Sequence, residues 1–92
     1  MIDVEVKIYA PFTKKTGQSL IRVTLKEGAN VHDLVMGLLE QFPELDCSQQ
    51  TRLDPECFMR EALLLKGETI VQMHDPLQDG DRVHMLPAIV SG

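Results

Sequence analysis

Aromatic and basic residues are scarce in this chain of 92 residues. Tryptophan is absent and only 4% of the residues are aromatic, so aliphatic side chains must build the core. The 9 Lys and Arg residues are outnumbered by 14 Asp and Glu residues, which gives a net charge of −5. Because binding to nucleic-acid phosphates requires clustered basic side chains, this balance argues against a nucleic-acid partner and is compatible with a basic protein partner.

Long apolar runs and cysteines are also scarce. No run approaches the roughly 20 apolar residues that span a bilayer, and residues 1–4 lack the basic and apolar regions of a signal peptide. We therefore expect a cytoplasmic protein with no membrane contact. Cys47 and Cys57 are then predicted to be thiols, with a disulfide between them as the alternative. The pair is too small a ligand set for a metal site, so no metal is expected.

Alternating apolar and polar residues, typical of half-buried strands, occur over residues 3–10 and again over residues 20–26. Only a polar turn at 13–17 lies between them, which favours an antiparallel hairpin. Asn30 is a good helix N-cap, and Pro43 stops the helix that follows. The apolar stripe of this helix recurs at helical spacing and consists of Val31, Leu34, Val35, Leu38, Leu39 and Phe42.

The second half of the chain predicts three further strands. Residues 62–65 are continuously apolar, which indicates a strand buried on both faces, and residues 69–71 indicate a short edge strand. A tight turn at 79–81 precedes a last strand over 82–86. The pattern predicts one α+β domain over residues 1–92, with a mixed sheet of four to five strands packed on one main helix. No Cys or Ser pairs visibly with a base, so the sequence shows no constellation for nucleophilic catalysis.

The tail over residues 87–92 carries no charged side chain. Pro87 fixes its own φ and favours an extended exit from the sheet. One interpretation is that Ile89 and Val90 fold back onto the core. The other is that the tail is a flexible probe, because an extended segment can offer its backbone to a partner's groove. Gly92, which has no Cβ, would then enter a narrow channel with its carboxylate at the tip.

Residues 77–87, which read LQDGDRVHMLP, resemble the C-terminal signature of the MoaD/ThiS family of ubiquitin-like sulfur carriers. That signature is a DGD turn and a strand, followed by a proline-led tail that ends in Gly-Gly. Residues 6–10, 16–17 and 31–34 resemble the family's opening strand, loop and helix start. The resemblance spans nearly the whole chain and is strongest to MoaD, the small subunit of molybdopterin synthase. It implies the β-grasp, or ubiquitin-like, fold.

The same resemblance implies a function. In this family a MoeB-like adenylyltransferase, related to ubiquitin-activating enzymes, uses ATP to adenylate the terminal glycine, which then becomes a thiocarboxylate. The carrier is non-catalytic, holds no permanent cofactor, and donates sulfur to a pterin precursor within a MoaE-like large synthase subunit. By position, Gly92 carries the sulfur. The implied partner-binding residues form an apolar docking patch and an inserted arm, namely Ile70, Leu86, Pro87, Ala88, Ile89, Val90 and Ser91.

Two positions depart from the family pattern. Ser91 stands where the family has a glycine, and Ala88 stands where it has a second proline. Three interpretations stay open: the activating enzyme's channel accepts serine, the chain lacks one further glycine, or this member no longer carries sulfur. Two rival functions also stay open. One is a thiamin-type carrier such as ThiS, and the other is a ubiquitin-like binding module that uses its sheet surface rather than its end.

Overall fold

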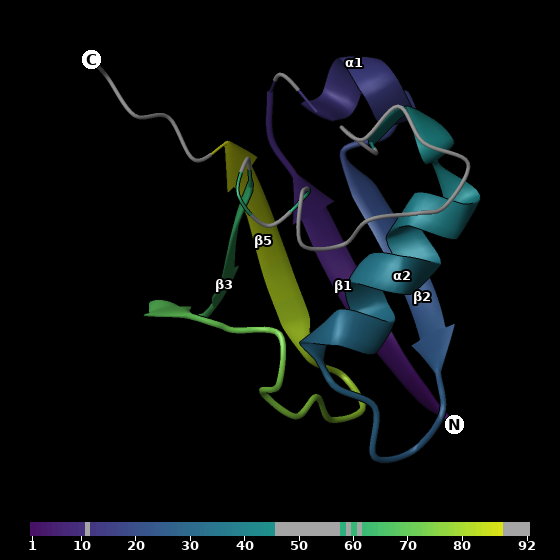
Figure 1. The fold of residues 1–92 in the computed structure, drawn as a ribbon, viewed down its shortest axis with the longest axis vertical. Helices are drawn as coiled ribbons and strands as arrows, with labels where there is room; N and C mark the ends of the chain where they lie inside the picture. The colour runs from purple at the N-terminus through teal and green to yellow at the C-terminus, as the bar shows by residue number, and fades with distance from the viewer. Residues whose placement is uncertain (11, 46–57, 59, 61, 88–92) are drawn as a thin grey trace.

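Five strands form one mixed sheet in the order β2-β1-β5-β3-β4 in the computed structural model (Figure 1), which describes residues 1–10, 12–45, 58, 60 and 62–87. The parallel pair β1 and β5 lies at the centre, and the other neighbouring strands pair antiparallel. The strands are β1 (Ile2–Ile8), β2 (Leu20–Leu25), β3 (Ala62–Lys66), β4 (Thr69–Ile70) and β5 (Arg82–Pro87). The predicted mixed sheet is therefore confirmed, and the last strand runs one residue beyond its predicted end.

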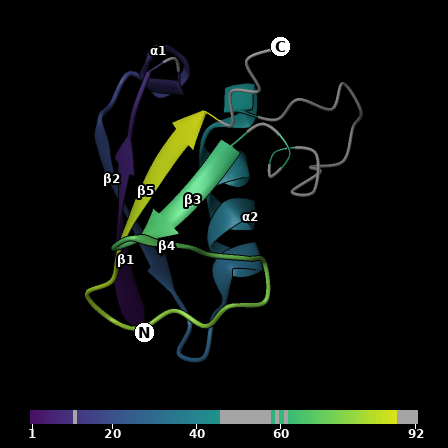
Figure 2. The ribbon, with the colours of Figure 1, turned by 90° about the vertical axis from the view of Figure 1, so that its left-hand side faces the viewer.

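The main helix, α2 (Val31–Gln41), covers one face of this sheet (Figure 2). Its start is closed by a capping box. The Asn30 side-chain oxygen accepts a hydrogen bond from the Asp33 backbone N–H at 3.0 Å, and the Asp33 carboxylate accepts one from the Asn30 N–H at 3.1 Å. These bonds satisfy two donors at the helix start. The predicted stripe is buried at Val31, Leu34, Val35, Leu38 and Leu39, whereas Phe42, its sixth member, caps the end of the helix and is only partly buried.

A short helix, α1 (Phe12–Thr16), occupies the segment that the sequence predicted as a polar turn. It packs through Phe12, which is 5% exposed and whose ring centroid lies 6.1 Å from that of Phe58. Gly17 ends the helix at a φ of +72°, and its N–H donates to the Thr13 carbonyl at 2.8 Å. With a single apolar side chain turned inward, this helix leaves no periodic signal in the sequence. A 3-10 helix, η1 (Pro43–Leu45), follows α2.

The two faces of the sheet differ in burial. On the inner face, which packs against α2, side chains such as Val4, Leu64 and Met85 are 0% exposed. On the outer face, Leu63 is 38% exposed and Leu65 is half-buried. The prediction that residues 62–65 are buried on both faces was therefore wrong, because α2 covers only one side of β3 (Figure 2).

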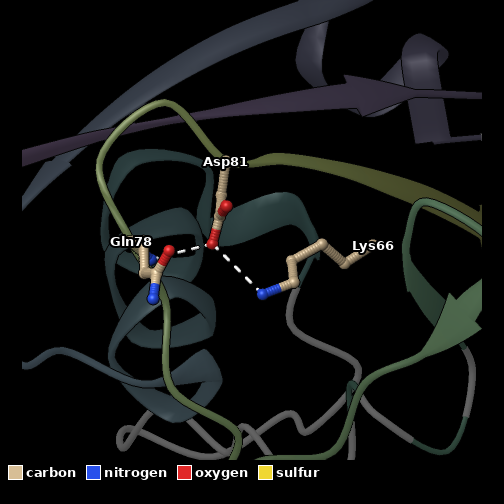
Figure 3. A network of polar contacts seen from close by, with 3 residues as sticks. All are labelled: Lys66, Gln78 and Asp81. Atoms are coloured by element: carbon tan, nitrogen blue, oxygen red, sulfur yellow. Dashed lines mark hydrogen bonds and ion pairs between the residues drawn. The ribbon is translucent and has the colours of Figure 1, made fainter.

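Asp81 holds the turn that leads into β5 (Figure 3). Its carboxylate accepts a hydrogen bond from the Gln78 backbone N–H at 2.8 Å and lies 3.4 Å from Nζ of Lys66 on β3. Gly80 adopts a φ of +87°, and its N–H donates to the Asp3 carbonyl at 2.9 Å. The Asp-Gly-Asp sequence therefore ties the start of β5 to β1 and β3, which is a structural role.

Replacing Asp81 by alanine should lower the free energy of unfolding by about 1 kcal/mol, because the Gln78 N–H loses its acceptor within the turn. Asp81→Asn keeps an acceptor oxygen and loses only a partly exposed ion pair, so it should cost less than about 0.5 kcal/mol. Chemical denaturation of both variants and of Lys66→Met measures the two contributions. Equal losses for the alanine and asparagine variants would contradict a role for the turn hydrogen bond.

Gly37 lies on α2 where the helix approaches β2. A Cβ placed on Gly37 would lie 3.4 Å from Cγ1 of Val23, which is an ordinary contact distance. Glycine inside a helix costs about 1 kcal/mol relative to alanine. Gly37→Ala should therefore raise the free energy of unfolding by roughly 0.5–1 kcal/mol, as read from denaturant midpoints. The control is Gly28→Ala, which should destabilise because Gly28 has a φ of +83°. A loss of stability in Gly37→Ala would show that Val23 cannot accommodate the added methyl group.

Candidate functional site

The candidate site begins where β5 ends. Pro87, the last residue of β5, pairs with Ala62 of β3 and is half-buried. β5 ends at the same end of the sheet as α1 (Figure 1). The remaining predicted tail residues, which are Ala88, Ile89, Val90, Ser91 and Gly92, lie outside the described residues. The same holds for Cys47 and Cys57.

β5 is anchored on both edges as far as Met85, and its last two residues pair with β3. It pairs in parallel with β1 and antiparallel with β3, and the Tyr9 backbone N–H donates to the Met85 carbonyl at 3.1 Å. The inward side chains Val83 and Met85 are 0% exposed. A central strand with a buried inner face opens only with the whole domain, so β5 gives residues 88–92 a rigid base.

An apolar patch lies on the outer face beside this strand end, and we call it the outer patch. In antiparallel strands, directly paired residues share one face. Leu63 pairs with Leu86, and Leu65 pairs with Ile70, so these four side chains lie together. Ile70 is 58% exposed and Leu63 is 38% exposed, while Leu65 and Leu86 are half-buried. Of the predicted docking residues, Ile70 and Leu86 thus share this face, and the two added leucines were not predicted.

Three polar residues border the outer patch, and we call them the polar corner: Lys7, Tyr9 and His84. The Tyr9 hydroxyl lies 3.0 Å from Nδ1 of His84, and Lys7 Nζ lies 5.6 Å from the centroid of the Tyr9 ring. The register places His84 between Lys7 of β1 and Leu65 of β3. Alternation along the chain indicates that Tyr9 and His84 point outward, but their proximity depends on the β1–β5 pairing, which no local pattern predicts.

Other site classes find little support among the described residues. No group of three or more His, Cys, Asp or Glu side chains in that part of the chain is placed to hold a metal ion. A shallow surface pocket lies at the opposite end of the sheet from the end of β5, and it is lined by Met1, Thr24, Leu25, Lys26, Ala29 and Asp33. Asp33 is already engaged there in the capping box. In the ranges that the structure covers, no helix has the length and apolar character needed to cross a membrane.

No protein-family model and no curated protein matches this chain. Solved structures do match it. SAMP1 from Haloferax volcanii aligns with a TM-score of 0.78 at 19% identity, over 98% of this chain and 99% of its own. A protein described as molybdopterin converting factor, subunit 1, from Pyrococcus furiosus aligns with a TM-score of 0.79 at 23% identity, over 97% of this chain and 100% of its own.

A chain in the complex of subunits 1 and 2 of molybdopterin-converting factor from Helicobacter pylori also matches. It aligns with a TM-score of 0.62 at 16% identity, over 99% of this chain and 100% of its own. Each of these matches covers nearly the whole of this chain and nearly the whole of the matched chain, so together they establish the fold class. The chain has a MoaD/ThiS-like, ubiquitin-like β-grasp fold, as the sequence resemblance predicted.

Ile70 and Val71 form a matched pair for testing whether the outer patch contributes to stability. Ile70→Asp should change the free energy of unfolding by less than about 1 kcal/mol, because Ile70 is 58% exposed on an edge strand. Val71→Asp should cost about 3 kcal/mol or more, because Val71 is 5% exposed and its site would bury an unpaired carboxylate. Thermal and chemical denaturation measure both. A large loss in Ile70→Asp would make Ile70 a core residue rather than a surface available to a partner.

Proposed function

We propose that this protein is a ubiquitin-like sulfur carrier that works through the carboxylate of Gly92. The observation that carries the proposal is the match in fold, over nearly full length, to molybdopterin converting factor subunit 1. The resemblance of residues 77–87 to the family's C-terminal signature supports it further. So does the position of β5, which connects a rigid sheet directly to residues 88–92.

The chemistry requires little from the carrier itself. A carboxylate is a poor acyl donor until one oxygen becomes a good leaving group. In the proposed sequence, a Gly92 carboxylate oxygen attacks the α-phosphorus of ATP and pyrophosphate leaves, which forms an acyl-adenylate. A hydrosulfide-level donor then attacks the acyl carbon and AMP leaves, which forms the thiocarboxylate. The thiocarboxylate sulfur then attacks an electrophilic carbon of the acceptor and displaces a leaving group there. Water cleaves the acyl carbon–sulfur bond, which leaves the sulfur on the acceptor and restores the Gly92 carboxylate.

The catalytic groups for these steps belong to two protein partners in this proposal. A MoeB-like adenylyltransferase would supply the ATP site, and a MoaE-like large synthase subunit would hold a pterin precursor as the sulfur acceptor. The arm would be Pro87 with Ala88, Ile89, Val90 and Ser91. The outer patch would be the surface on which each partner docks, because clustered exposed apolar side chains on a small domain favour protein contact.

Protein conjugation is a second candidate function, and the likeness to SAMP1, described as a small archaeal modifier protein, favours it. Here the activated Gly92 carbonyl would be attacked by a lysine amine of a target protein, with AMP or an intermediate thiol as the leaving group. Both functions share the activation step, so they differ in the product.

The thiamin-type carrier stays as a further alternative to the pterin pathway. Supplying a thiamin precursor or a pterin precursor to the loaded carrier, and measuring which one receives the sulfur, distinguishes the two.

Intact-mass measurement tests the proposal directly. The chain is incubated with ATP, a sulfide donor and the adenylyltransferase of the same organism. The expected product is heavier by one oxygen-to-sulfur exchange, and deletion of Gly92 should abolish this change because the reacting carboxylate is displaced. A target protein carrying a Gly92-linked lysine, with no thiocarboxylate, would support conjugation instead. The absence of both products from the intact chain would contradict either function.

Ser91→Gly tests whether the serine that replaces the family's glycine at this position affects loading. It restores the ending of the family without touching the described fold. If a tight channel disfavours a Cβ at this position, Ser91→Gly should be loaded faster than the natural chain. Equal loading rates would show that the channel accepts serine, and loading of the glycine variant alone would show that the natural chain no longer carries sulfur.

A further inference from the structure

The polar corner lies on the same face as the outer patch. His84 sits between Lys7 and Leu65 in the sheet register, so any protein that covers Leu65 and Leu86 also approaches the His84 ring. The Tyr9 and His84 rings lie 5.9 Å apart by their centroids, and the side-chain hydrogen bond of 3.0 Å joins two residues separated by 75 positions. This contact holds the imidazole in a defined orientation.

The chemistry of the polar corner favours an acceptor from outside. Among the described residues, the hydrogen bond to Tyr9 is the only one that the His84 side chain makes. When the Tyr9 hydroxyl donates to Nδ1, the neutral imidazole carries its proton on Nε2, and a protonated imidazole also donates from Nε2. The Lys7 ammonium adds three donors and a positive charge. In this tautomer, and in the protonated ring, the corner offers donors that the aliphatic side chains of the outer patch cannot satisfy.

Of the charged residues around the polar corner, the acidic ones have partners within the described part of the chain and Lys7 does not. On the same face, Glu5 lies 3.4 Å from Arg82, and the Asp3 carboxylate accepts a hydrogen bond from Thr24 at 2.8 Å. Lys7 makes no ion pair with any residue in the described part of the chain. A purely apolar partner would strip water from Lys7 and His84 without compensation, which costs free energy. A carboxylate placed there would restore the lost hydrogen bonds and complement the charge.

We infer that the partner which covers the outer patch presents an Asp or Glu carboxylate to Lys7 and Nε2 of His84. The inference rests on the proposed function, because it takes the outer patch as the docking surface of the activating enzyme and the large synthase subunit. A carboxylate at this position would fix the orientation of the partner on the outer patch, which contacts to four aliphatic side chains alone would not do. The acidic group sits on the β1 side of the patch and the apolar groups sit on the β3 and β4 side. The net charge of −5 is compatible with a basic partner, but at this corner the local charge favours an acidic group.

Zero-length carbodiimide cross-linking tests the carboxylate. The reagent joins an amine to a carboxylate only where the two are in contact. The chain is mixed with the purified adenylyltransferase or large synthase subunit of the same organism, and the linked peptides are sequenced by mass spectrometry. The expected product joins Lys7 to an Asp or Glu of the partner. Lys7→Arg should bind equally well yet lose this cross-link, because a guanidinium does not react.

Affinity measurements separate charge from apolar contact. Lys7→Glu should weaken binding about tenfold through repulsion of the carboxylate. The charge-matched control is Lys26→Glu, which follows the end of β2 away from Lys7 and should change binding less than about twofold. His84→Phe keeps the ring area but removes the donor, so it should weaken binding about fivefold. If the contact at His84 were only apolar, His84→Phe would bind equally or more tightly.

The outcomes distinguish this inference from the proposed function. Three results together support both the inference and the proposed function: binding of the natural chain is lost in Ile70→Asp, Lys7 forms the cross-link, and Lys7→Glu and His84→Phe weaken binding as expected. Binding that depends on Ile70 but is indifferent to Lys7→Glu and His84→Phe, with no Lys7 cross-link, overturns the inference and leaves the proposed function standing. Failure of the natural chain to bind either partner overturns both.

Discussion

The burial of the α2 stripe against the inner face of the sheet is the interaction on which the rest of the structure depends. β1 and β5 lie at the centre of the sheet, and their inward side chains, such as Val6 and Val83, are fully buried. Because this single helix covers one face only, the apolar side chains of β3 and β4 that point the other way remain exposed. The same packing that stabilises the core therefore leaves the outer patch available for contact.

The central place of β5 joins stability to the proposed function. Its parallel pairing with β1 holds the strand as far as Met85, its antiparallel pairing with β3 continues to Pro87, and the Asp81 turn fixes its start. A carrier whose chemistry is performed by other proteins needs a rigid body, a reachable end and a docking face. In this fold Leu86 of the outer patch and Pro87, where the tail begins, are neighbours on β5, so a partner positioned by the outer patch would lie close to the start of the tail.

Much of the fold follows from local patterns. Alternation indicates β1 and β2, helical spacing indicates α2, and Asn30 and Pro43 lie next to the ends of that helix. Two features escape such patterns for physical reasons. α1 has only Phe12 buried, so it has no periodicity to detect. The continuous apolar run at 62–65 reads as a doubly buried strand, yet Leu63 is exposed because burial depends on what covers a face.

The sequence by itself determined the strands and main helix in order and the uncharged character of residues 87–92, because each of these depends on residues close together in the chain. The class of fold was predicted by the family resemblance. Only the tertiary structure decided which apolar residues are core and which are surface. It also decided that Tyr9 meets His84 across 75 positions and that Leu63 meets Leu86. These contacts depend on strand order and register. The pairing of β1 with β5 depends on the packing of the whole buried core, so no short segment of the sequence specifies it.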